Sequence, residues 1–172
     1  MKVHIHHKNV LDVEADTLAL PVDGSAPGLE GNIARQFMKR VGAEEMHELY
    51  APPPYYPFNG DCYWSNIAPF QDKTHFRHIC CLGMLSHSPD ANHEGYITSA
   101  FDRMLGLAAM DPGQGENIAL PVLHGGGRLK YIDAVYLMLK IIEQNRRSIQ
   151  GVTLHIAERD PERFAILRDI IG

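Results

Sequence analysis

The sequence lacks several features that would place it in a familiar class. Cysteine is scarce, because the 172 residues contain only Cys62, Cys80 and Cys81. An odd number with two adjacent members does not make a disulfide framework, so a reducing compartment is expected. No apolar run approaches the length of a membrane span, and the first ten residues lack the apolar core of a signal peptide. We therefore expect a cytoplasmic protein with no membrane partner.

Clustered positive charge is also missing. The chain has no long basic run, and its formal net charge is -5 at pH 7. General nucleic-acid binding is not expected, because it requires a clustered Lys/Arg surface. Apolar residues make up 45% of the chain, which is enough for one well-filled core. No linker or low-complexity segment interrupts the sequence, so residues 1–172 are interpreted as a single domain.

Histidine is plentiful, but its spacing does not favour a metal site. His4 and His6 share one face of an expected strand, and His7 lies on the other. Cys80 and Cys81 also alternate across an expected strand. No C-x-x-C or H-E-x-x-H spacing occurs. Neither a bound metal nor a cofactor is expected.

Hydrophobic periodicity predicts strands that alternate with helices. Strands are expected around Val3 to Ile5 and at Thr17 to Val22, Asp61 to Ile67, Arg77 to Leu82, Ile118 to Leu123 and Val152 to Ala157. Helices are expected at Asn32 to His47, at Tyr96 to Met110, at Tyr131 to Asn145 and after the Asp160-Pro161 pair. The proline-rich stretch 51–60 is expected to be a surface loop. This order is typical of an α/β domain with a largely parallel sheet.

Two of the expected strands run into glycine-bearing loops. Ala19-Leu20-Pro21-Val22 leads toward Gly28 to Gly31, and its repeat at 119–122 leads into His124 to Gly127. Ligands of open α/β sheets bind at the carboxyl ends of the strands, where bare backbone N–H groups suit a phosphate. One glycine run alone is as well explained by a flexible turn. Two such loops at one edge favour a ligand with several phosphates, or with a phosphate flanked by sugars.

Four short motifs lie at the ends of the expected elements: Lys8-Asn9-Val10, Ala15 to Asp23, Gly28 to Ile33 and Ile118 to Gly126. In composition and order they resemble the motifs of macrodomains, the family that binds ADP-ribose. The last, IALPVLHGG, is the most specific, since it is similar to the family's Ile-Ala-Phe-Pro-x-Ile-Ser-Thr-Gly in the loop that wraps a diphosphate. The resemblance implies an α/β class fold, a three-layer α/β/α sandwich with a central mixed, largely parallel sheet.

The resemblance also implies roles for individual residues. The ligand-binding residues would be Asn9, Val10, Gly28, Leu29, Glu30, Gly31, Ile33, Gly125, Gly126, Gly127 and Arg128. Asp23 corresponds to the family asparagine that faces the distal ribose, where a carboxylate can act as a general base with His124 as proton donor. Simpler roles compete with these: Asn9 and Asp23 are common turn residues, His124 can donate to a backbone carbonyl, and Arg128 can be solvated.

Two functions stay open at this point. The first is binding, or binding and hydrolysis, of ADP-ribose or a related nucleotide-sugar diphosphate, free or attached to an ADP-ribosylated macromolecule. The second is a divergent macro-like scaffold or interaction module that has lost this ligand or takes another phosphorylated metabolite. The glycine loops favour the first function. By the same resemblance, Asn9 replaces the family aspartate that accepts from the adenine amino group, Asp23 replaces the asparagine, and His124 replaces a serine. These three differences favour the second function.

Overall fold

The structure, a computed structural model, describes residues 1–24, 30–42, 44, 58–67, 70, 72–111 and 116–172. The loop predicted at 51–60 lies mostly outside these residues. Six strands form one sheet: β1 (Lys2–His6), β2 (Thr17–Asp23), β3 (Cys62–Asn66), β4 (His78–Leu85), β5 (Asn117–Pro121) and β6 (Thr153–Ala157). Their order is β1-β6-β5-β2-β4-β3, and only β3 runs antiparallel to its neighbour. The predicted mixed, largely parallel sheet is confirmed.

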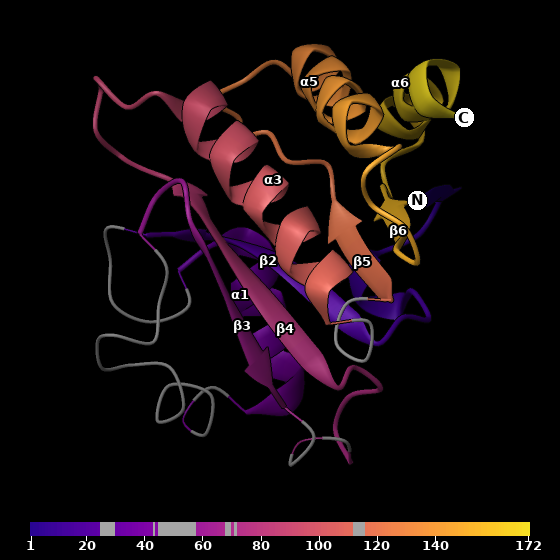
Figure 1. Cartoon of the computed structure of the whole chain (residues 1–172). Helices are drawn as coiled ribbons and strands as arrows, with labels where there is room; N and C mark the ends of the chain where they lie inside the picture. Colours follow the sequence, from indigo (N-terminus) through magenta and orange to yellow (C-terminus); the bar gives the residue numbers. More distant parts are fainter. Residues whose placement is uncertain (25–29, 43, 45–57, 68–69, 71, 112–115) are drawn as a thin grey trace.

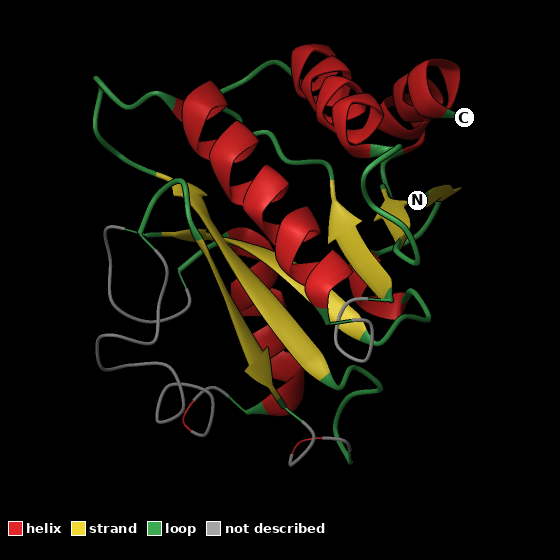
Figure 2. Cartoon of the chain, in the orientation of Figure 1, coloured by secondary structure: helices red, strands yellow, loops and turns green. Residues whose placement is uncertain are grey.

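Helices cover both faces of this sheet. They are a short 3-10 turn, η1 (Val10–Asp12), and the helices α1 (Asn32–Val41), α3 (His93–Met110), α5 (Tyr131–Asn145) and α6 (Pro161–Ile171). Helices α3, α5 and α6 pack on one face, and α1 with η1 packs on the other (Figures 1 and 2). The three-layer sandwich is therefore confirmed. In the described parts of the chain, no helix is both long enough and apolar enough to cross a membrane.

The alternation of side chains along β4 explains how one strand serves both layers. Cys80 and Leu82 belong to the core beneath α3, whereas Ile79 and Cys81 belong to the core beneath α1. The two adjacent cysteines thus point to opposite faces, as predicted. Burial raises the pKa of the Cys81 thiol to about 12 and the pKa of Cys80 well above its ordinary value. Both thiols stay protonated and act as small apolar core groups.

Capping residues decide where two of the helices begin. The closing helix starts as predicted, because Asp160 Oδ1 accepts a hydrogen bond of 2.9 Å from a first-turn N–H and Pro161 occupies the first turn. Helix α3 starts at His93, three residues before the predicted Tyr96. The reason is Asn92, whose Oδ1 accepts from a backbone N–H at 3.0 Å and so moves the start upstream.

Strands β2 and β5 are neighbours over only a short distance. Their register is Thr17 with Ile118 and Leu18 with Ala119, and the pairing goes no further. Pro21 and Pro121 lie near the carboxyl ends of the two strands, and proline has no N–H to donate to a ladder. The repeated Ala-Leu-Pro-Val sequence therefore marks the place where two central strands part.

A hydrogen-bonded row of side chains crosses the sheet near the edge strand β1. His155 Nε2 lies 3.3 Å from Asn117 Oδ1, and His155 Nδ1 lies 3.0 Å from His6 Nε2. Because the amide oxygen only accepts, neutral His155 donates from Nε2 and accepts at Nδ1. The pKa of His155 is lowered by burial and by the neighbouring His6 and His4. No three His, Cys, Asp or Glu side chains of the described residues are grouped to hold a metal ion.

We expect the free energy of unfolding to decrease as the pH falls below about 6.5, the ordinary pKa of histidine. The pKa of His6 is also lowered, by burial and then by Lys8 and His4, so the unfolded chain takes up protons that the folded chain does not. Melting temperatures recorded between about pH 8 and about pH 5.5 will show the decrease. In the variant His155→Gln, the melting temperature should decrease less over the same pH range. Parallel curves for the two proteins would contradict this assignment.

Candidate ligand-binding site

A cavity of about 290 Å³ opens at the carboxyl ends of the parallel strands. Its walls are the residues that follow β1 and β6, the ends of β2 and β5, the start of α1, and Leu85 at the end of β4. The volume is close to the lower end of the roughly 300–1,000 Å³ of small-molecule sites. Its place at the edge of the sheet is where ligands of open α/β folds bind.

The glycine loop after β5 forms one wall of the cavity. Gly125, Gly126 and Gly127 have φ angles of 62°, 66° and 89°, a region that other L-residues rarely adopt. The Gly127 N–H donates to His124 Nδ1 at 2.7 Å. The N–H groups of Gly125 and Gly126 have no acceptor among the described residues, and both glycines line the cavity. The loop thus offers two unsatisfied backbone donors to a ligand.

His124 is held as a neutral hydrogen-bond donor. Burial lowers the pKa of its imidazole, and the nearby Arg163 guanidinium lowers that pKa further. Because Nδ1 accepts from the loop backbone, the neutral ring carries its proton on Nε2. His124 also lines the cavity. Its side chain therefore both shapes the loop and supplies a donor at the site.

Gly31 joins the end of the first predicted glycine loop to helix α1. A Cβ atom at this position would collide with the Pro21 carbonyl oxygen, so only glycine fits. The same Cβ position lies 3.3 Å from Leu85 Cδ1, and a Cβ at Gly126 would lie 3.7 Å from Leu85 Cδ2. The Leu85 side chain is therefore the point at which the described parts of the two glycine segments meet.

The start of α1 is exposed to the cavity without a side-chain cap. Its N-cap is Gly31, which contributes no side-chain hydrogen bond. In the described part of the chain, the N–H groups of Asn32 and Ile33 have no acceptor, and both residues line the cavity. Unsatisfied N–H groups at a helix start attract an anion. The helix was predicted to reach residue 47; its described part ends at Val41.

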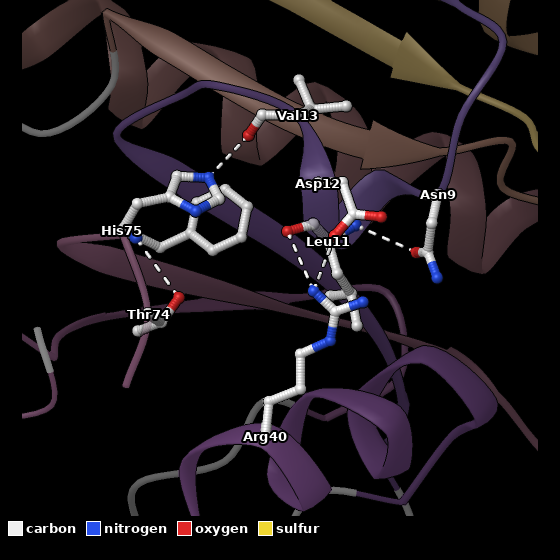
Figure 3. Close-up of polar contacts among 8 residues, drawn as sticks. Asn9, Leu11, Asp12, Val13, Arg40, Thr74 and His75 are labelled. Carbon is white, nitrogen blue, oxygen red and sulfur yellow. Dashed lines mark hydrogen bonds and ion pairs between the residues drawn. The ribbon is translucent and has the colours of Figure 1, made fainter. Parts of the chain in front are cut away.

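Asn9 lines the cavity and starts η1. Its Oδ1 accepts a hydrogen bond of 3.0 Å from the Leu11 N–H. Arg40 of α1 holds the same turn in place, since its Nη1 lies 2.8 Å from Asp12 Oδ1 (Figure 3). Asn9 thus has the turn role that its sequence context allows. Its second oxygen lone pair and its amide N–H groups stay available on the cavity wall.

Asp23 closes β2 and is only 6% exposed. Its N–H donates to the Glu30 carbonyl at 2.8 Å, which ties together the two ends of the loop between them. Its Oδ2 lies 3.9 Å from Nε2 of the exposed His87. The carboxylate does not line the cavity.

Comparison with known proteins identifies the architecture. No family model and no curated protein matches the sequence. Solved structures do match. A variant of the Oceanobacillus iheyensis macrodomain with ADPR superposes with a TM-score of 0.74 and 15% identity, over 98% of this chain and 91% of that one. The same macrodomain with ADP superposes with a TM-score of 0.73 and 16% identity, over 98% of this chain and 89% of that one. The Trypanosoma brucei macrodomain in complex with ADP-ribose superposes with a TM-score of 0.76 and 12% identity, over 99% of this chain and 69% of that one.

The chain has the macrodomain fold. The resemblance seen in the sequence motifs is confirmed at this level. TM-scores of 0.73–0.76 establish the shared fold, and identities of only 12–16% carry no information about the ligand.

Within this macrodomain fold, the residues predicted to bind a ligand fall into three groups. Six line the cavity: Asn9, Val10, Ile33, His124, Gly125 and Gly126. Five others are described but do not line it: Asp23, Glu30, Gly31, Gly127 and Arg128. Gly28 and Leu29 lie outside the described residues.

Several lining residues of the macrodomain cavity were not predicted. Lys8 follows β1, Glu158 and Arg159 follow β6, and Arg163 lies in the first turn of α6. The sequence did contain a signal for Glu158 and Arg159, because they directly follow the predicted strand that ends at Ala157. The rule that ligands bind beyond the carboxyl ends of strands points to the polar residues that come next.

Proposed function

We propose that the chain binds ADP-ribose or a related nucleotide-sugar diphosphate in this cavity. The observation that carries the proposal is the pair of unsatisfied N–H groups at Gly125 and Gly126, in a loop that lines the cavity. A phosphate supplies the acceptors that these unsatisfied donors require. The uncapped start of α1 adds two further donors and the favourable end of a helix dipole.

The known macrodomains support the nature of this ligand. Two of the solved structures with this fold are in complex with ADP-ribose or hold ADP. The ligand can be the free nucleotide or an ADP-ribosyl group on a macromolecule. Cys62, Cys80 and Cys81 are buried free thiols, which supports a reducing, cytoplasmic setting.

Calorimetric titration with ADP-ribose is the direct test. We expect saturable binding to one site per chain, with adenosine at least about tenfold weaker because it offers no phosphate to the loop donors. A thermal shift should accompany binding, since a ligand present at about 100 times its Kd stabilises the fold by about 2.7 kcal/mol. Neither heat nor a shift with millimolar ADP-ribose would contradict the proposal and favour the scaffold function.

Hydrolysis of an ADP-ribosyl ester or similar conjugate is the second proposed function. The observation in its favour is His124, a cavity residue whose neutral ring carries its proton on Nε2 and can pass it to a leaving group. In this scheme Asp23 is the general base that orients the attacking water. Asp23 is the last residue of β2, two positions after Pro21, which lines the cavity.

A further inference from the structure

One end of the cavity carries positive charge from three separate elements. Lys8 follows β1, Arg159 follows β6 and Arg163 belongs to α6, and all three line the cavity. These elements gather beside the N-terminus in Figure 1. In the sheet, β6 lies next to β5, and β1 lies one strand further. Because neighbouring strands are about 4.8 Å apart, the chain segments that follow β6 and β1 lie about 5 Å and about 10 Å from the segment that follows β5.

These cations are not neutralised within the described part of the protein. The side chains of Lys8 and Arg159 form no ion pair with a described residue. Arg163 lies over the ring of Tyr131 at 5.3 Å from its centroid, which holds the guanidinium in place. Three unneutralised positive groups on one wall favour an anion there.

Among the described residues, Glu158 is the only acid that lines this part of the cavity, and its side chain already accepts a hydrogen bond. Its Oε1 accepts a hydrogen bond of 2.9 Å from the Asp160 N–H. The backbone that carries both Glu158 and Arg159 is fixed to the edge strand, because the Glu158 N–H donates to the His6 carbonyl at 3.0 Å. The cationic end is therefore built on anchored backbone, and its charge balance is positive.

We infer that the cationic end binds a second anionic group of the ligand, separate from the phosphates at the glycine loop. Asn9 also follows β1 and lines the cavity at this end, and its amide offers both a donor and an acceptor, which suits the edge of a nucleobase. The preferred ligand is accordingly a nucleotide-sugar diphosphate that carries a further phosphate on its nucleoside ribose. This inference rests on the proposed function and specifies its substrate class.

The test compares ADP-ribose with ADP-ribose 2′-phosphate by calorimetry on the full chain. We expect the wild-type protein to bind the phosphorylated ligand at least about tenfold more tightly. In the double variant Lys8→Gln/Arg159→Gln the difference between the two ligands should shrink to about twofold or less, because the larger loss of affinity falls on the phosphorylated ligand. Arg163 is left unchanged because it packs on the Tyr131 ring. Added salt should reduce the wild-type preference, since it screens the extra contact.

A matched control is available at the other end of the same strands. Lys2→Gln/Arg147→Gln removes the same two charges at exposed positions near the amino ends of β1 and β6, and it should keep the full preference. Equal affinity of the wild-type protein for both ligands overturns the inference and leaves the proposed function standing. An equal loss of affinity for both ligands in Lys8→Gln/Arg159→Gln would also overturn the inference, because it would mean that the two cations bind a part that both ligands share. Failure of both ligands to bind the wild-type protein overturns the proposed function as well.

Discussion

Replacing Gly126 with glutamate is expected to abolish ADP-ribose binding, with a loss of more than about 100-fold in affinity. Gly126 lines the cavity at a φ of 66°, and among the described residues a Cβ atom there would contact only the Leu85 side chain. The added side chain therefore has room to extend into the cavity, where we propose that the phosphate lies. Its carboxylate would repel the phosphate across a short distance in a partly enclosed space. Calorimetry with ADP-ribose measures the loss.

Gly151→Glu is the matched control for this change. Gly151 has a φ of 77° and lies just before the amino end of β6, away from the cavity, and a Cβ atom added to it would meet no atom of the described residues within 4 Å. Both variants add one negative charge and place a side chain in the left-handed region, at a cost of about 1–2 kcal/mol each. Similar melting temperatures with binding lost only at Gly126 are the expected pattern. Wild-type affinity in Gly126→Glu would show that the phosphates bind elsewhere.

Asp23→Ala is expected to remove turnover if the chain hydrolyses an ADP-ribosyl conjugate. General-base assistance contributes about 10²–10⁴ in rate, so the loss should be of that size. The rate of release of ADP-ribose from an ester-linked substrate measures it, and a melting curve on the same sample reports the fold. ADP-ribose affinity should change little, because the carboxylate does not line the cavity.

Two companion variants separate catalysis from a turn role. Asp23→Asn keeps the shape of the buried side chain but cannot take a proton, so it should be as inactive as Asp23→Ala while remaining folded. His87→Ala removes the exposed imidazole 3.9 Å from the carboxylate and should retain activity. Wild-type turnover in Asp23→Asn would show that the catalytic assignment is wrong. Unfolding of Asp23→Ala alone would mean that the residue is structural.

The sequence predicted the layers of the fold better than the composition of the site. Alternation along β4 and the Asp160-Pro161 start of α6 are local signals, and the structure follows both. The early start of α3 depends on one capping side chain, Asn92, within a polar stretch that has no periodicity. Strand order is a long-range property, so nothing local indicated that β1 pairs with β6 and places Lys8 beside Arg159.

In the glycine loop, the sequence likewise did not predict which backbone N–H groups are hydrogen-bonded within the protein. Its phosphate-binding character was predicted from three adjacent glycines and their place after a strand. The sequence could not show that His124 itself takes up the Gly127 N–H and leaves those of Gly125 and Gly126 unsatisfied. That division of donors depends on side-chain geometry, which a pattern of residue types does not contain.

The parting of β2 and β5 after two paired residues has a consequence for how this cleft can change over evolution. The opening is made by backbone chemistry, because Pro21 and Pro121 have no donors with which to continue a ladder. It exists before any ligand arrives, so binding requires little reorganisation. Side chains on the surrounding loops can then be exchanged without closing the opening. Single substitutions in these loops can therefore change which ligand the cleft prefers while the opening itself is kept.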